Sequence, residues 1–92
     1  MEFIKYNEAY SINDNTMEGW VVTGQAFKEV DGSIKITFSA SNTGEHIGSC
    51  NYSINADNTI NANRTYNVQV KDAFEAYAEN TVNTILEHFG IN

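Results

Sequence analysis

Cysteine and proline are almost missing from this chain of 92 residues, which has one cysteine, Cys50, and no proline. A single cysteine cannot form an internal disulfide, and it cannot supply the paired cysteines of the usual zinc sites. Secretion therefore gains no support from the composition. Thirteen asparagines are available for turns and solvated strands, and neither place requires a further function.

Positive charge is also scarce, with five Lys and Arg against twelve Asp and Glu and a formal net charge of -7. Because proteins bind phosphate backbones through Lys and Arg, this balance argues against direct nucleic-acid binding. The same negative field attracts a basic protein partner and speeds the encounter. The plain alternative is that the acidic surface only keeps the protein soluble.

Long apolar runs are missing as well, since no stretch reaches the roughly 20 residues that a membrane-spanning helix needs. The opening sequence MEFIK lacks the basic and apolar regions of a signal peptide. We therefore expect a cytoplasmic protein with no membrane segment. The length and the 41% hydrophobic content fit one compact domain over residues 1–92.

Apolar residues that alternate with period two predict five strands, over residues 3–12, 20–29, 33–41, 46–55 and 60–70. The sequence VDGS at 30–33 marks a hairpin, whose loop length decides the register. A three-residue loop with Gly32 in a left-handed bulge sets Gly24 opposite Phe38 and buries Trp20 beside it. A two-residue loop would instead place the odd-numbered residues of the strand 20–29 on the core face. We favour the three-residue loop because it buries Trp20. Even positions, including Val68, then face the core.

The spacing of apolar residues becomes helical after the last predicted strand, and it predicts a helix over residues 73–89. Asp72 and Glu75 resemble a capping box at its start, and Gly90 suits its end. A helix of this length spans about 25 Å and can lie across a small sheet. The predicted fold class is α+β: a two-layer, five-stranded antiparallel meander with one C-terminal helix packed on one face.

One short sequence occurs twice, as YSINDNT at 10–16 and as YSINADNT at 52–59. In each copy Tyr and Ile are two residues apart on one strand face, and Asn and Asp follow where a turn begins. The residues on either side of the match do not continue it. We therefore interpret the repeat as the same local turn used twice, and not as a duplicated site.

Residues for catalysis are sparse. His46 and Cys50 would lie about 13 Å apart on an extended strand, which is too far for a nucleophile and its base. Cys50 lies among apolar positions, so we interpret it as a core residue. The sequence contains no phosphate-binding loop, nucleophile elbow or clustered metal-ligand spacing. We expect no enzyme activity, no metal and no cofactor.

The exposed face of the predicted helix is the first candidate binding surface, with carboxylates at Asp72, Glu75, Glu79 and Glu87. Such a row can imitate the phosphates that a basic groove binds, although it can also be only a solvated helix face. We therefore expect a small acidic protein-interaction module. A sharper hypothesis is an inhibitor that occupies the basic groove of a nucleic-acid-binding protein. Small acidic phage-encoded inhibitors are similar in size and charge alone.

The outward face of the predicted sheet is the second candidate surface, because it is rich in hydroxyls and amides. Phe27, Asn51 and Asn63 are candidate contacts there, and Ile47 is a further outward position. Amides donate and accept hydrogen bonds at once, so this face suits a carbohydrate or a peptide. An open sheet that simply faces water is the alternative. An exposed edge strand could pair two copies, but the sequence does not fix the oligomeric state.

Overall fold

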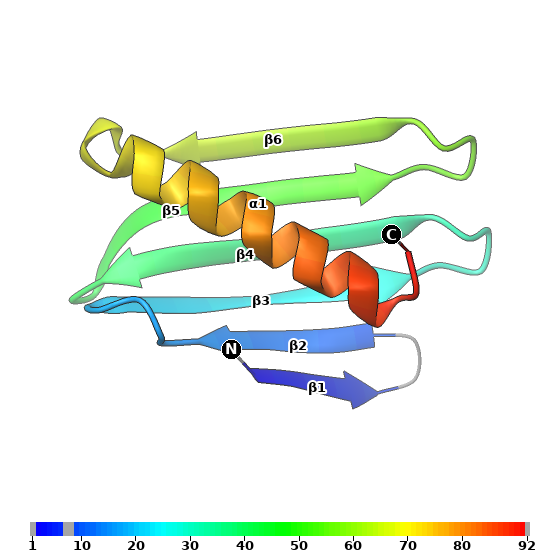
Figure 1. Cartoon of the computed structure of the whole chain (residues 1–92), viewed down its shortest axis with the longest axis horizontal. Coiled ribbons are helices and arrows are strands. Elements are labelled where there is room, and N and C mark those ends of the chain that lie inside the picture. The colour runs from blue at the N-terminus through cyan, green and yellow to red at the C-terminus, as the bar shows by residue number, and fades with distance from the viewer. Residues whose placement is uncertain (1, 7–8, 92) are drawn as a thin grey trace.

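The structure of the protein is a computed structural model that describes residues 2–6 and 9–91. In these residues, six strands form one antiparallel sheet in chain order, and one helix crosses one face of it (Figure 1). The elements are β1 Glu2–Tyr6, β2 Ala9–Asp14, β3 Trp20–Lys28, β4 Ile34–Asn42, β5 Glu45–Ile54, β6 Ile60–Tyr66, the short 3-10 turn η1 Val68–Val70 and α1 Lys71–His88. The predicted two-layer antiparallel meander with a C-terminal helix is confirmed.

The number of strands differs from the prediction. Residues 3–12 were expected to form one strand, but residues 3–6 belong to β1 and residues 9–12 to β2, and these strands pair antiparallel with Phe3 opposite Ile12. Alternation of apolar residues is the same in one long strand and in two strands of a hairpin. No glycine or proline occurs between 3 and 12 to mark a boundary, so the pattern alone could not separate the two strands.

The last predicted strand ends earlier than residue 70. β6 stops at Tyr66, and residues 68–70 form η1. The expected inward placement of Val68 was therefore wrong, since its side chain is 80% exposed. Asn67 caps the turn, because its side-chain oxygen accepts a hydrogen bond from the backbone N–H of Gln69. This local bond competes with strand pairing and redirects the chain into α1.

The hairpin of β3 and β4 has the predicted register, with Gly24 opposite Phe38. Its turn places Gly32 at a φ of 92°, in the left-handed region that favours glycine. A Cβ atom on Gly24 would lie 2.6 Å from the Cα of Phe38 and 2.1 Å from the carbonyl oxygen of Thr37. The two backbones therefore approach too closely for a side chain at this position. Trp20 and Phe38 are both buried in the same core, as predicted.

The core lies between α1 and the inner face of the sheet. Its main members are Ile12, Trp20, Val22, Ala26, Ile34, Ile36, Phe38, Cys50, Phe74, Ala78, Val82 and Ile85. Gly48 of β5 makes room for the helix, because a Cβ atom there would come within 2.7 Å of the Phe74 ring. Cys50 is fully buried in this cluster, which confirms its interpretation as a core residue.

A β-bulge in β5 changes which of its residues face inward. The register shifts where Ala40 pairs with Gly48 and Ser41 pairs with His46, so Ile47 is the extra residue. Ile47 is 8% exposed and belongs to the core, while His46 is exposed. The expected outward placement of Ile47 was wrong because strict alternation does not continue through a bulge.

Candidate functional site

Three aspartates of this acidic chain stabilise turns in the same way. The backbone N–H groups of Thr16, Ser33 and Thr59 donate hydrogen bonds to the carboxylates of Asp14, Asp31 and Asp57, respectively. The hydroxyl groups of Ser33 and Thr59 donate to the same acceptors, and both kinds of bond lower the pKa of Asp31 and of Asp57. The two copies of the repeated sequence thus share the Asp14–Thr16 and Asp57–Thr59 hydrogen bond, but only the second copy contains a complete hairpin turn, with Asn58 at a φ of 68°.

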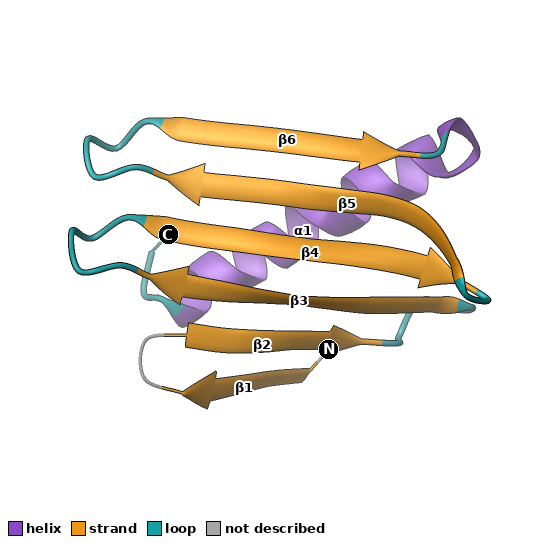
Figure 2. Ribbon diagram, turned by 180° about the vertical axis from the view of Figure 1, so that it is seen from behind, coloured by secondary structure: helices purple, strands orange, loops and turns teal. Residues whose placement is uncertain are grey.

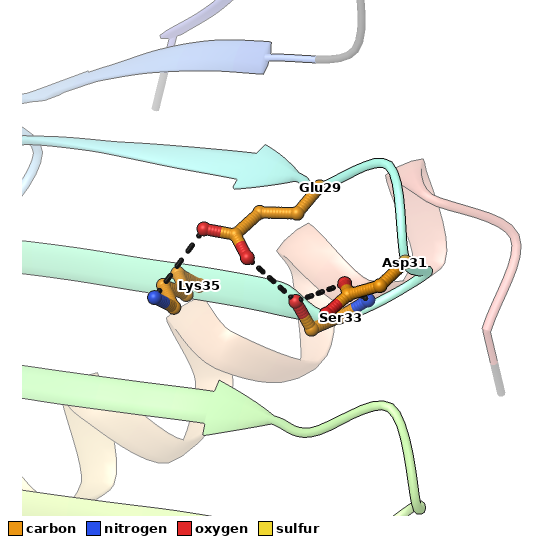
Figure 3. Close-up of polar contacts among 4 residues, drawn as sticks. All are labelled: Glu29, Asp31, Ser33 and Lys35. Atoms are coloured by element: carbon orange, nitrogen blue, oxygen red, sulfur yellow. Dashed lines mark hydrogen bonds and ion pairs between the residues drawn. The ribbon is translucent and has the colours of Figure 1, made fainter.

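Glu29 also belongs to a turn, the one between β3 and β4 (Figure 3). Its Oε1 atom lies 3.3 Å from Nζ of Lys35, and its Oε2 atom lies 3.0 Å from the hydroxyl oxygen of Ser33. The same hydroxyl is 2.7 Å from Asp31, and with one proton it donates to one carboxylate at a time. The ion pair is solvent-exposed and adds little stability. The contacts of this group join the two sides of the turn, so we assign these residues to the hairpin and not to a binding site.

Asp14 is buried, at 5% exposure, and it accepts a hydrogen bond of 2.6 Å from the hydroxyl of Tyr77. Burial raises the pKa of Asp14, but the hydrogen bonds from Tyr77 and Thr16 outweigh that effect and hold the pKa below its ordinary value. Burial and the neighbouring carboxylate together raise the pKa of Tyr77. Because a hydrogen bond to a charged acceptor is strong, this contact fastens α1 to the end of β2.

The predicted helix carboxylates divide into two groups. Asp72, Glu79 and Glu87 are exposed, and at 3.6 residues per turn they lie on the side of α1 opposite the buried residues. Asp72 and Glu79 are about 10 Å apart along the axis, and Glu79 and Glu87 about 12 Å. Glu75 is partly buried and accepts a hydrogen bond from the hydroxyl of Tyr66, which raises the pKa of Tyr66. Glu75 is therefore tied to β6.

The second predicted surface is the face of the sheet away from α1 (Figure 2). Cross-strand partners form three polar rows over β3 to β6: Gln25–Thr37–Asn51–Asn63, Thr23–Ser39–Ser49–Thr65 and Phe27–Lys35–Ser53–Asn61. In the first row the hydroxyl of Thr37 donates a hydrogen bond of 3.1 Å to the side-chain oxygen of Asn51. Hydroxyl and amide groups therefore cover this face with few charges.

Two shallow concavities lie side by side in this polar face. The larger, of about 460 Å³, lies over β4 to β6 and includes Asn51 and Asn63 in its lining. The smaller, of about 360 Å³, lies over β3 to β5, and Thr37 lines both. Phe27, the third predicted contact, lines neither of the two. The structure thus pairs Asn51 with Asn63 and leaves Phe27 apart from them, on β3, two strands away from Asn51.

Comparisons of the chain with protein-family models, with curated proteins and with solved structures found no match.

The remaining chemistry-bearing residues do not assemble a site. Within residues 2–6 and 9–91, no three His, Cys, Asp or Glu side chains gather as a metal ion would require. Burial raises the pKa of the Cys50 thiol, while the positive charge of Arg64 opposes that effect, and a protonated buried thiol is a poor nucleophile. The helix of the described region is not long and apolar enough to cross a membrane.

Two contacts with carboxylates were missed by sequence reasoning. Tyr77 reaches Asp14 across 63 positions of sequence, and Tyr66 reaches Glu75 from a different element. Neither pair has a short-range spacing that would reveal it. The only available signal was that each tyrosine lies on the apolar face of its helix or strand, where a buried hydroxyl needs a hydrogen-bond partner.

Proposed function

We propose that this protein is a non-enzymatic interaction module that binds a basic partner protein through the outer side of α1. The observation that carries the proposal is the division of the carboxylates. Asp14, Asp31 and Asp57 stabilise turns, whereas Glu79 and Glu87 are exposed and their carboxylates have no hydrogen bond or ion pair within the described residues. Asp72 extends the same side, although it also stabilises the first turn of the helix.

The chemistry of the partner follows from the spacing and the total charge. Carboxylates about 10 and 12 Å apart on one side of a helix present a row of negative charge to a basic groove, as phosphates do, and the packed core behind α1 keeps the helix in place. The net charge of -7 adds a long-range attraction toward a positive groove. The sharper proposal is therefore an inhibitor that occupies the basic groove of a nucleic-acid-binding protein.

Charge reversal on the helix tests this proposal. We expect the double variant Glu79→Lys and Glu87→Lys to weaken binding to basic nucleic-acid-binding proteins by about tenfold or more, because like charges then meet. The matched control is Glu18→Lys with Glu45→Lys, which changes the net charge equally at exposed positions outside the helix. Binding is measured by surface plasmon resonance at rising salt, and wild-type affinity should fall as salt rises.

Two outcomes contradict the proposal. Affinity that is indifferent to salt would mean that charge does not drive the contact. Equal losses in the helix variant and in the control would mean that only the net charge matters, and that the side of α1 defined by Glu79 and Glu87 has no special place in binding.

A second candidate function rests on the two concavities of the outer sheet face, which suit a polar ligand such as a carbohydrate. We expect the wild-type protein to bind a glycan on an array, and we expect Asn51→Ala and Asn63→Ala to abolish that binding, since both residues line the larger concavity. Phe27→Ala should have a smaller effect. The exposed helix residue Asn83 provides the control substitution Asn83→Ala. A glycan signal that survives the sheet substitutions excludes this face as the site.

A further inference from the structure

The inner face of the sheet loses its cover toward β6. Along one row of cross-strand partners, Ile34 of β4 is 1% exposed, Ile54 of β5 is half-buried and Ile60 of β6 is 57% exposed. In the next row Ile36 is buried, whereas Ala62 is exposed. Figure 1 shows the reason, because α1 runs diagonally from the end of β6 toward β2 and β3 and leaves the start of β6 beyond it.

β6 is also an edge strand. Among the described strands it pairs with β5 alone, so one row of its backbone N–H and C=O groups faces away from the sheet. Natural sheets commonly protect such edges with charged residues, proline or a covering segment. The sequence INANRTY at 60–66 contains one charged residue, Arg64, and neither an acidic residue nor a proline. This edge has little of the usual protection.

We propose that β6 pairs antiparallel with β6 of a second copy of this chain. The net charge of -7 repels a second copy at long range, but residues 60–66 carry no carboxylate, so this repulsion is least at the β6 edge. The placement of the exposed apolar residues favours a second copy. Ile60 begins β6, and Val68, which is 80% exposed, follows its end. Antiparallel pairing about a two-fold axis sets the Ile60 end of one β6 beside the Val68 end of the other.

The paired sheets would have a definite arrangement. A two-fold axis between two edge strands of one continuous sheet runs perpendicular to that sheet, so both copies of α1 lie on the same side. The polar outer rows continue across the junction, since Asn61, Asn63 and Thr65 face outward in both copies. The start of β6, which is uncovered in one chain, then lies beside the end of the partner's β6, where the partner's α1 begins.

Sedimentation equilibrium of the whole chain over a concentration series tests the pairing. We expect a monomer–dimer equilibrium that tightens as salt rises, because screening weakens the repulsion between two negatively charged copies. The proposed helix contact with a basic partner weakens as salt rises, so either proposal can fail without the other. A chain that stays monomeric at every concentration and salt overturns the pairing.

Substitutions at the edge locate the interface. Ile60→Lys should raise the dimer dissociation constant by about tenfold or more, because it sets like charges at a self-pairing edge. The matched control is Val21→Lys, on the internal strand β3, where the native side chain is 55% exposed. The control should leave the dissociation constant unchanged. A dimer that resists Ile60→Lys, or one that Val21→Lys weakens equally, overturns the proposal.

Hydrogen–deuterium exchange of the wild type keeps the proposal testable even if a lysine variant fails to fold. Amides of residues 60–66 should exchange more slowly at concentrations where the dimer forms, since the outward N–H groups become hydrogen-bonded. Circular dichroism shows whether each variant keeps its fold. Dimer formation without added protection in residues 60–66 would place the contact elsewhere and overturn the proposal.

Discussion

Strands β4 and β6 belong to one sheet, but they differ in what covers them. Ile36 and Phe38 of β4 are at most 1% exposed beneath α1, whereas Ile60 of β6 is 57% exposed at the edge. One helix that crosses a six-stranded sheet covers the middle and leaves a margin. The difference teaches that the buried core is concentrated in β2 to β5, and that the start of β6 leaves apolar surface exposed.

The largest effect is expected from Phe38→Ala in the covered region. The Phe38 ring lies 6.4 Å from the Phe74 ring and 6.2 Å from the Tyr77 ring, centroid to centroid. Removing it leaves a cavity, so the free energy of unfolding should fall by about 3–5 kcal/mol. Urea denaturation measures this loss. A loss below about 1 kcal/mol would break the comparison, because the covered region would then not be close-packed.

A smaller effect is expected from Tyr77→Phe, which removes the hydrogen bond to buried Asp14. The free energy of unfolding should fall by about 1–3 kcal/mol, because the carboxylate loses a donor that water cannot easily replace. Tyr52→Phe is the control, since no hydrogen bond of the half-buried Tyr52 hydroxyl is found in the described residues. The control should cost less than about 0.5 kcal/mol, and equal costs would contradict the assigned role of Asp14.

The same pair of residues predicts how stability depends on pH. The folded-state pKa of Asp14 is lowered, so its contribution is present at neutral pH and is lost as the pH falls below 3.8, its ordinary value. The pKa of Tyr77 is raised, so its contribution is present below 10.0 and is lost as the pH rises above that value. The thermal unfolding temperature should be highest and nearly constant at neutral pH, and it should fall at acid pH and again at alkaline pH. Tyr77→Phe should make the acid loss and the alkaline loss smaller. Losses of unchanged size would refute the assignment.

The smallest effect is expected from Ile60→Ala in the uncovered margin. Ile60 is already largely exposed, so the free energy of unfolding of the dilute protein should change by less than about 0.5 kcal/mol. Urea denaturation at low concentration, beside Phe38→Ala, gives the direct contrast. A cost above about 1 kcal/mol would mean that the start of β6 is covered within a single chain, and the comparison with β4 would fail.

The sequence predicts the fold best where neighbouring elements decide it. The register of β3 and β4 depends on a short turn and Gly32, and it was predicted correctly. The separate strands β1 and β2 and the bulge at Ile47 were missed, because each breaks an alternation that looks continuous in the sequence. The early end of β6 depends on the Asn67 cap, which competes with an apolar pattern that continues to Val70.

The candidate sites follow the same rule. Exposure of Asp72, Glu79 and Glu87 follows from helical periodicity alone, so the sequence could predict it. The tie between Glu75 and Tyr66 could not be predicted, because it depends on how α1 returns over β6. Likewise, the alternation placed Asn51 and Asn63 on the outward face of the sheet. Their cross-strand pairing and the concavity that both residues line depend on the order and twist of the strands, so the sequence could not predict them.

Every strand pairs with its neighbour in the chain, whereas α1 follows all of them and reaches back to β2, where the hydroxyl of Tyr10 bonds the carbonyl oxygen of His88. During synthesis on the ribosome, the strands therefore emerge before the segment that seals them. Their apolar side stays bare until residues 71–88 have left the exit tunnel. A chain that ended before Lys71 would keep that apolar side exposed to water.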